Sequence, residues 1–206
     1  MLSTTTSAEI LERYAKGERN FEGVVITAGN FSNVDLKGII FRNAILMNGN
    51  FRNTDLSDTD FTNAKLERCD FHNAILRNSK FFRSDLGWAN LKACIMDNTN
   101  FRESNLQWAH LCSNDIARAD IKNANLSWSC LIGSNMTNDQ LSNVPNTVLS
   151  TINRIEDRRE EQQKSLGGYS LPVSIARNYG SGSVDITKGY SWNLPEESDK
   201  KRKFMC

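Results

Sequence analysis

The sequence predicts an all-β solenoid, and three observations carry this prediction. Every residue whose number ends in 1 or 6 between Phe21 and Met136 is large and apolar, in 24 of 24 positions. The residue two places before each of them is usually small, and the residue directly before it is often Asp or Asn. Phenylalanine fills every second repeat from Phe21 to Phe81, with Leu or Ile in most of the repeats between.

A period of five fits neither a helix face, which repeats every 3.6 residues, nor a strand face, which repeats every two. A fixed internal repeat is typical of a solenoid, in which each unit buries its apolar residue only against its neighbours. A chain with one large and one small inward residue per unit can turn a corner every five residues and close a square coil every twenty. The 24 repeats then make about six coils, spaced by about 4.8 Å, with phenylalanine on two opposite walls.

The segment before the repeats, residues 1–20, contains the signals of a short helix. The run from Thr6 to Glu9 is a capping box, with Thr6 at the N-cap and Glu9 at N3. An apolar stripe follows, and Gly17 suits the position just past a helix end. We therefore expect a helix at 7–16 that covers the open edge of the first coil, because an uncovered edge pairs with other strands.

The repeat domain is expected to span 21–141, and the pattern fades towards its end. Residues 142–166 are expected to form a capping or docking helix with one apolar stripe. This stripe comprises Val148, Leu149, Ile152 and Ile155. Residues 167–206 make a polar tail rich in Gly and Ser, and the sequence leaves open whether this tail is ordered.

The repeat unit resembles the A(D/N)LXX motif of the pentapeptide-repeat family. Residues 84–86 (Ser-Asp-Leu) and 124–126 (Ala-Asn-Leu) match this motif directly, and residues 12–21 look like the lead-in of cyanobacterial members. The resemblance covers residue 20 to about residue 141. It implies that the solenoid is a right-handed quadrilateral parallel β-helix.

Three of the four tryptophans are spaced by one expected coil. Trp88, Trp108 and Trp128 each follow an inward leucine by two residues, so we expect them to stack in one column. Exposed apolar patches usually mark contacts, which makes the column a candidate interaction patch. The chain's own C-terminal segment, a partner protein or second copy, or a single-stranded nucleic acid could cover it; the last needs a basic groove that is missing. Tryptophan at this position also predicts a corner without positive φ.

The five cysteines show no paired spacing in the sequence. Cys69 and Cys94 fall at the small inward position, where a free thiol acts as a small hydrophobe. This usage favours a reducing cytoplasm. His110 shares an expected column with Cys130, and Cys112 lies near the same corner, but zinc normally takes four such ligands. We find three at most, so no metal site is predicted.

Composition and missing motifs exclude several function classes. The chain of 206 residues carries a net charge of +1, and residues 21–141 hold 13 acidic and 12 basic residues. That balance argues against a strong field for nucleic acid. No apolar run approaches the ~20 residues of a membrane span. There is no phosphate-binding glycine loop, nucleophile elbow or paired metal-ligand motif, so we predict no enzyme, no catalytic residue and no cofactor.

The favoured hypothesis is therefore a non-catalytic structural or protein-interaction module. Its partner is another protein or a second copy, bound through the tryptophan column or the C-terminal segment; no nucleic acid and no membrane span are expected. The family resemblance implies an alternative, because some pentapeptide-repeat proteins imitate duplex DNA and regulate a type II topoisomerase such as gyrase. That role needs a strongly acidic face, and the near-neutral rod disfavours it.

Overall fold

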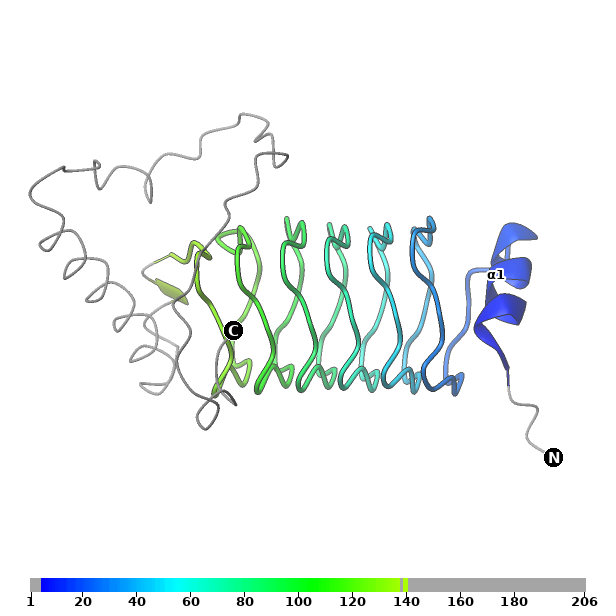
Figure 1. Cartoon of the computed structure of the whole chain (residues 1–206), viewed down its shortest axis with the longest axis horizontal. Coiled ribbons are helices and arrows are strands. Elements are labelled where there is room, and N and C mark those ends of the chain that lie inside the picture. The colour runs from blue at the N-terminus through cyan, green and yellow to red at the C-terminus, as the bar shows by residue number, and fades with distance from the viewer. Residues whose placement is uncertain (1–4, 138, 141–206) are drawn as a thin grey trace, which may run out of the picture.

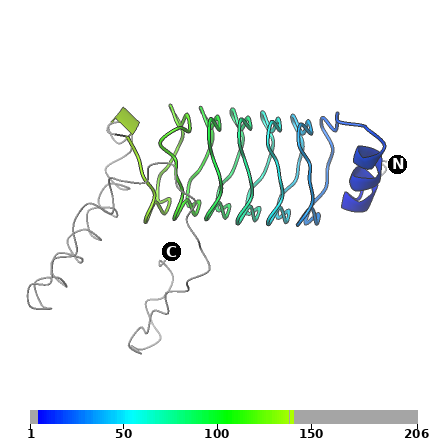
Figure 2. The ribbon, with the colours of Figure 1, turned by 90° about the horizontal axis from the view of Figure 1, so that it is seen from above.

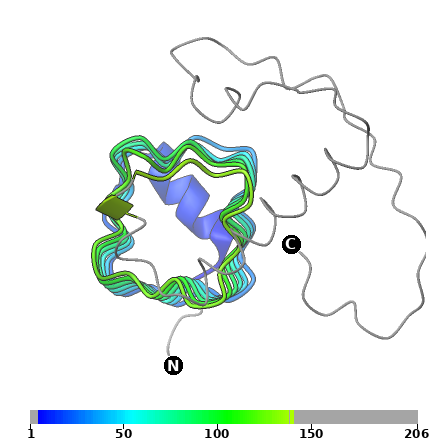
Figure 3. The ribbon, with the colours of Figure 1, turned by 90° about the vertical axis from the view of Figure 1, so that its left-hand side faces the viewer.

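The computed structural model describes residues 5–137 and 139–140, which form one helix followed by a four-sided rod (Figure 1). Parallel bridges join residues twenty apart along the rod, from the pair Asn20 and Ile40 to the pair Asp115 and Asn135. Viewed along the axis in Figure 3, the coils lie over one another in a four-cornered outline. The predicted coil of twenty residues is therefore present.

Each side of a coil is too short for a long strand. One residue in every five is a bridge residue, and a two-residue turn separates each bridge from the next. In the described part of the chain the pairing thus consists of isolated bridges rather than extended strands. The solenoid prediction holds for the parallel pairing between coils, while a corner every five residues leaves about three extended residues per side.

Backbone hydrogen bonds join each coil to the next coil and to the previous coil in a regular pattern. The N–H of the inward Phe51 donates to the carbonyl of Asp70 in the next coil at 2.7 Å, and the N–H of Asp70 donates back to Gly49 at 2.9 Å. Most backbone groups along the walls are paired in this way, which is the requirement that burial imposes on a polar main chain.

Phenylalanine rings fill the core as two stacks that face each other across the axis. Phe51 stacks on Phe31 and on Phe71, each at a ring-centroid distance of 5.0 Å with planes within 8°. Phe61, on the other wall, stacks on Phe81 at 4.9 Å and meets Phe51 edge-on at 6.0 Å. Offset stacks along the axis and edge contacts across it are both favourable aromatic geometries. The prediction of phenylalanine on two walls is confirmed.

The helix α1 (Ser7–Ala15) precedes the rod. Its N-cap is Thr6, whose hydroxyl oxygen accepts the N–H of Glu9 at 3.2 Å, as the capping pattern predicts. Beyond the C-cap, Gly17 adopts a φ of 96°, which a residue without a side chain adopts at little cost.

This helix lies over the first coil (Figures 1 and 2). Its Ile10 is completely buried, and the Tyr14 hydroxyl donates to the carbonyl of Lys37 at 3.0 Å. The Ser7 hydroxyl accepts the N–H of Asn30 at 3.3 Å. The helix therefore supplies the first coil with apolar contact and with partners for its open edge.

At the other end of the rod, Gln140 ties the last described turn to the coil before it. Its side-chain amide donates to the carbonyls of Ile116 at 2.9 Å and Ala119 at 2.8 Å. The last residue of the expected repeat domain, Leu141, the expected helix at 142–166 and the polar tail at 167–206 lie outside the described residues.

Candidate functional site

The three tryptophans form one stacked column along the outside of the rod. The rings of Trp88 and Trp108 lie 5.0 Å apart with planes inclined by 8°, and those of Trp108 and Trp128 lie 5.3 Å apart at 10°. The expected stack is therefore present. Its role as an interaction patch stays a prediction.

The column is exposed at both ends and partly covered in the middle. Trp88 is 54% exposed and Trp128 is 55% exposed, and Trp108 between them is half-buried. Large aromatic side chains of a folded protein are seldom this accessible. Because each ring rests on its neighbour, the indoles present an ordered apolar edge rather than three independent side chains.

The backbone at this column contradicts one expectation. Trp88, Trp108 and Trp128 have φ values of 62°, 61° and 62°, whereas tryptophan there predicts a corner without positive φ. The coil geometry explains the difference, because almost every corner of the rod places its second turn residue in the left-handed region. This left-handed conformation costs a residue with a side chain about 1–2 kcal/mol. The hydrogen bonds between coils offset that cost, since the N–H of Trp88 donates to the carbonyl of Gln107 at 3.0 Å.

The surface beside the column is close to neutral. On the wall that leads into this corner, Asp85 accepts the side-chain amide of Asn105 at 2.8 Å, and Asn105 accepts that of Asn125 at 3.3 Å. On the turn itself, Gly87 carries no side chain, and its N–H donates to Asp85 at 3.1 Å. Asp85 is thus engaged within the rod, while Glu67 and Arg68 lie one coil below Gly87 and Trp88, so the lower end of the column borders one charge of each sign.

The corner on another side of the rod has the same backbone but different chemistry. Arg83 and Glu103 also have positive φ and are vertical neighbours, with Nε of the arginine 2.8 Å from a carboxylate oxygen of the glutamate. This pair offers a matched comparison for the tryptophans, because the conformation is the same and neither corner position carries an aromatic side chain; the Arg83 guanidinium lies 4.8 Å from the ring centroid of the neighbouring Phe82.

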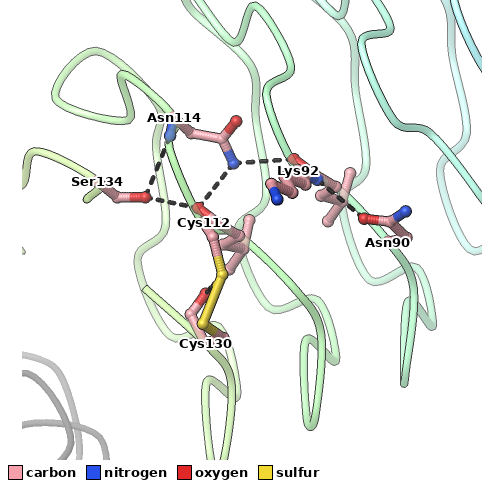
Figure 4. The surroundings of a disulfide bond; sticks show 8 residues. Asn90, Lys92, Cys112, Asn114, Cys130 and Ser134 are labelled. Carbon is pink, nitrogen blue, oxygen red and sulfur yellow. Dashed lines mark hydrogen bonds between the residues drawn. A yellow bond between two sulfur atoms is a disulfide. The ribbon is translucent and has the colours of Figure 1, made fainter. Parts of the chain in front are cut away.

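Sequence reasoning missed a disulfide. Cys112 and Cys130 are bonded, with Cα atoms 5.8 Å apart (Figure 4), a separation within the usual range. The signal was present in the register: Cys130 lies two residues before Ile132, the position one coil above Cys112. The expectation of unpaired cysteines is corrected, and the expected reducing cytoplasm loses the observation on which it rested.

The other two cysteines of the described part of the chain behave as expected for small inward residues. The thiols of Cys69 and Cys94 are buried and donate to the carbonyls of Leu46 and Phe71, both at 3.0 Å. Burial raises the pKa of both thiols to about 12, which leaves almost no reactive thiolate at neutral pH.

His110 lies on the column below Cys130 and is exposed. No cluster of three or more metal-ligating side chains occurs within residues 5–137 and 139–140. Since Cys112 and Cys130 bond to each other, they leave His110 without the thiolate partners that a zinc site at this corner would use.

The stacked carboxylates of the first coils form an ion-pair site. The ammonium of Lys37 lies 3.0 Å from a carboxylate oxygen of Asp55 and 4.0 Å from one of Asp35. Burial alone would raise the pKa of Asp55, but hydrogen bonds from Ser57 and Lys37 outweigh it and lower that pKa. A general acid needs a raised pKa, so the pair is suited to holding the lysine and not to proton transfer.

None of the helices in the described range is long and apolar enough to cross a membrane.

Comparison with known proteins gave two family matches. Residues 18–91 match the family model described as "Pentapeptide repeat region". Residues 79–113 and 115–138 match the model described as "Pentapeptide repeats (8 copies)". No protein among curated sequences matched the chain.

Solved structures of pentapeptide repeat proteins are similar to this chain. HetL of the cyanobacterium Nostoc sp. strain PCC 7120, involved in heterocyst differentiation regulation, is 25% identical with a TM-score of 0.34, over 63% of this chain and 61% of its own. Rfr23 of the cyanobacterium Cyanothece 51142 is 19% identical with a TM-score of 0.39, over 63% of this chain and 94% of its own. QnrB1, a plasmid-mediated fluoroquinolone resistance protein, is 24% identical with a TM-score of 0.37, over 57% of this chain and 65% of its own. The matches thus span less than two thirds of HetL and of QnrB1.

Proposed function

Because the chain belongs to the pentapeptide-repeat family, we propose that it is a non-catalytic interaction module whose rod presents the tryptophan column to a protein partner. The observation that carries the proposal is the exposed indole stack, 54% accessible at Trp88 and 55% at Trp128. The right-handed coil of the family and a rod of about six coils belong to the same proposal.

Three physical features suit this column to binding. Tryptophan is enriched among the residues that dominate interface energies. The stack holds the rings in place before binding, with centroids 5.0 and 5.3 Å apart, so little side-chain entropy is lost when a partner docks. Beside Trp108 and Trp128 the neighbouring rows carry uncharged side chains, so docking there buries apolar surface without stranding a charge.

The test compares the full-length protein with a triple variant, Trp88→Asn, Trp108→Asn and Trp128→Asn. Asparagine already occupies this corner position elsewhere in the rod, for example at Asn48 with a φ of 59°. The replacement therefore removes the indoles and keeps a residue that tolerates the conformation. The matched control is the double variant Arg83→Asn and Glu103→Asn, which changes the same backbone position on another side.

Two measurements read out binding: sedimentation for self-association, and capture from the host's lysate with identification of the bound protein. The proposal expects a specific complex with the wild type and the control variant and at least a tenfold loss with the tryptophan variant. Equal capture and equal association by all three proteins, at matched circular dichroism spectra, would refute a role for the column.

An imitation of duplex DNA is the second candidate in this family, and the charges of the rod weigh against it. Acidic side chains along the coils are paired with arginines at short range. These pairs include Arg42 with Asp60 at 2.8 Å, Arg52 with Asp70 at 3.0 Å and Arg83 with Glu103 at 2.8 Å. Phosphate mimicry requires uncompensated negative charge. Unchanged gyrase supercoiling at micromolar protein is the expected result, and inhibition that survives the loss of the tryptophans would favour the DNA-mimic role.

A further inference from the structure

The corner that contains the disulfide is the least regular part of the ladder. One coil earlier, the N–H groups of Leu76 and Asn78 donate to the next coil at 2.8 and 3.0 Å. The equivalent N–H groups of Met96 and Asn98 make no such backbone bond within residues 5–137. The wall that follows the disulfide corner has therefore lost part of the pairing that holds successive coils together.

A buried amide adds other hydrogen bonds at this corner, between the turns of successive coils (Figure 4). The side chain of Asn114 donates to the carbonyls of Leu91 at 2.9 Å and Leu111 at 2.8 Å, and its oxygen accepts the N–H of Cys94 at 2.7 Å. The N–H of Asn114 in turn donates to the hydroxyl of Ser134 in the last coil at 3.3 Å. Side chains thus perform here what the main chain performs elsewhere in the rod.

The disulfide adds a covalent link at this same corner. It crosses diagonally from Cys112, just after the inward Leu111, to Cys130, just before the inward Leu131. Most other members of these two outward rows are polar or charged and more accessible, such as Lys92, and Ile132 is the apolar exception; Cys112 is 8% and Cys130 is 3% exposed. Two buried cysteines in rows that otherwise face water indicate that these positions are used for the bond between them.

We propose that Cys112 and Cys130 form a reversible thiol–disulfide site that fixes the last coil, residues 121–137, to the rod, and that a dithiol reductant of the thioredoxin chemical class opens it. The inference goes beyond the interaction role and holds whether or not the tryptophan column binds a partner. The last coil carries Trp128, so the site also decides whether the third indole stays on the stack.

The reaction is a two-electron exchange that balances within the two dithiols. A thiolate of the reductant attacks Sγ of Cys112, the more accessible residue of the pair. The S–S bond breaks, and Cys130 leaves as a thiolate that takes up a proton. The second thiol of the reductant then displaces Cys112, which leaves the reductant as a disulfide and the protein with two thiols. Any disulfide oxidant of higher potential returns the bond by the reverse steps.

Cys112 and Cys130 are the reactive pair among the cysteines of the described coils. Cys69 and Cys94 are single, buried and held as neutral thiols by a pKa of about 12. Exchange with a reductant requires a thiolate or a disulfide. Treatment with a reductant therefore acts at one place in the rod.

The test measures amide hydrogen exchange of the full-length protein with Cys206 replaced by Ser, before and after dithiothreitol. We expect exchange within 121–137 to accelerate by about a hundredfold, the factor that the entropy of an 18-residue crosslinked segment implies. Exchange in the central coils, residues 41–80, should not change. Oxidised glutathione should restore the slow exchange.

Cys112→Ser is the key variant, since serine already occupies this outward row at Ser32. It should show the fast exchange of the reduced protein without dithiothreitol and no response to it, whereas Cys69→Ser should behave as the wild type. Alkylation under denaturing conditions gives an independent count, with two cysteines that react only after reduction. Protection of 121–137 that is unchanged by dithiothreitol, or alkylation of every cysteine without reduction, would overturn the inference.

Discussion

The stacked tryptophans allow one energetic prediction that separates contact from backbone strain. Replacing Trp108 and Trp128 by Asn, singly and together, removes the ring contact at 5.3 Å. Each single replacement also lowers the cost of the left-handed backbone, because asparagine tolerates φ values of 61° and 62° better than tryptophan does. It further loses the contact of that indole with its own wall.

These single-site terms cancel in a double-mutant cycle, because each occurs once in a single variant and once in the double variant. What remains is the pair term, which for stacked aromatic rings is about 0.5–1.5 kcal/mol. We therefore expect a coupling free energy of about 1 kcal/mol between Trp108 and Trp128. The pair Trp88 and Trp128 should show none, since Trp108 lies between them and their rings are two coil spacings apart.

The assay is urea unfolding followed by far-ultraviolet circular dichroism for the wild type, the single variants and the two double variants. Equal slopes against urea concentration are the control that the unfolded states are alike. A coupling below about 0.3 kcal/mol for the adjacent pair, or an equal coupling for the separated pair, would show that the indoles do not stabilise one another. The reasoning about a preformed surface would then fail, even if the column binds a partner.

Three further predictions follow from single contacts. Phe61→Ala should destabilise the rod by about 3–5 kcal/mol, measured by urea unfolding, because its ring packs on both stacks of the core. Acid should destabilise the protein through Asp60: burial would raise its pKa, but hydrogen bonds from Thr62 and Arg42 outweigh burial and lower it. This contribution is present above the unfolded pKa of about 4 and is lost as pH falls through the folded value, so thermal melts of Asp60→Asn should depend less on pH between 5 and 2. Gln140→Ala should speed hydrogen exchange near residues 116–119 about tenfold, since its amide donates two bonds of 2.8–2.9 Å there.

The interior of the rod was predictable because a single pattern determines it. The period of five identifies the inward residues. With four sides of five residues in each coil, the alternation of Phe and Leu places Phe31, Phe51 and Phe71 in one stack. The N-terminal helix was predictable from a local rule, the cap at Thr6. Both predictions rest on interactions between residues close in sequence or at one fixed spacing.

The positions of the outward side chains were predictable, but the backbone conformation of the tryptophans and the disulfide were not. The register places Trp88, Trp108 and Trp128 in one column, yet tryptophan predicts a corner without positive φ, and the coil imposes positive φ on it. The disulfide was missed for a related reason. Cys112 and Cys130 are 18 residues apart, a diagonal contact that a search at multiples of twenty overlooks.

Some corners of this rod hold residues against their backbone preference, and these corners bear on the proposed interaction surface. Gly and Asn fill many left-handed corners at little cost, as at Asn53 and Gly38, and need no other explanation. Among the residues with a higher cost there, two groups are vertical neighbours that contact one another: Arg83 and Glu103 form an ion pair at 2.8 Å, and the tryptophans form ring stacks. The two charges of the ion pair compensate each other within the rod, whereas Trp88 and Trp128 keep about half of their surface open to water. Because water solvates exposed charged side chains well and exposed indoles poorly, we propose the tryptophan column, and not the ion pair, as the set whose remaining surface a partner covers.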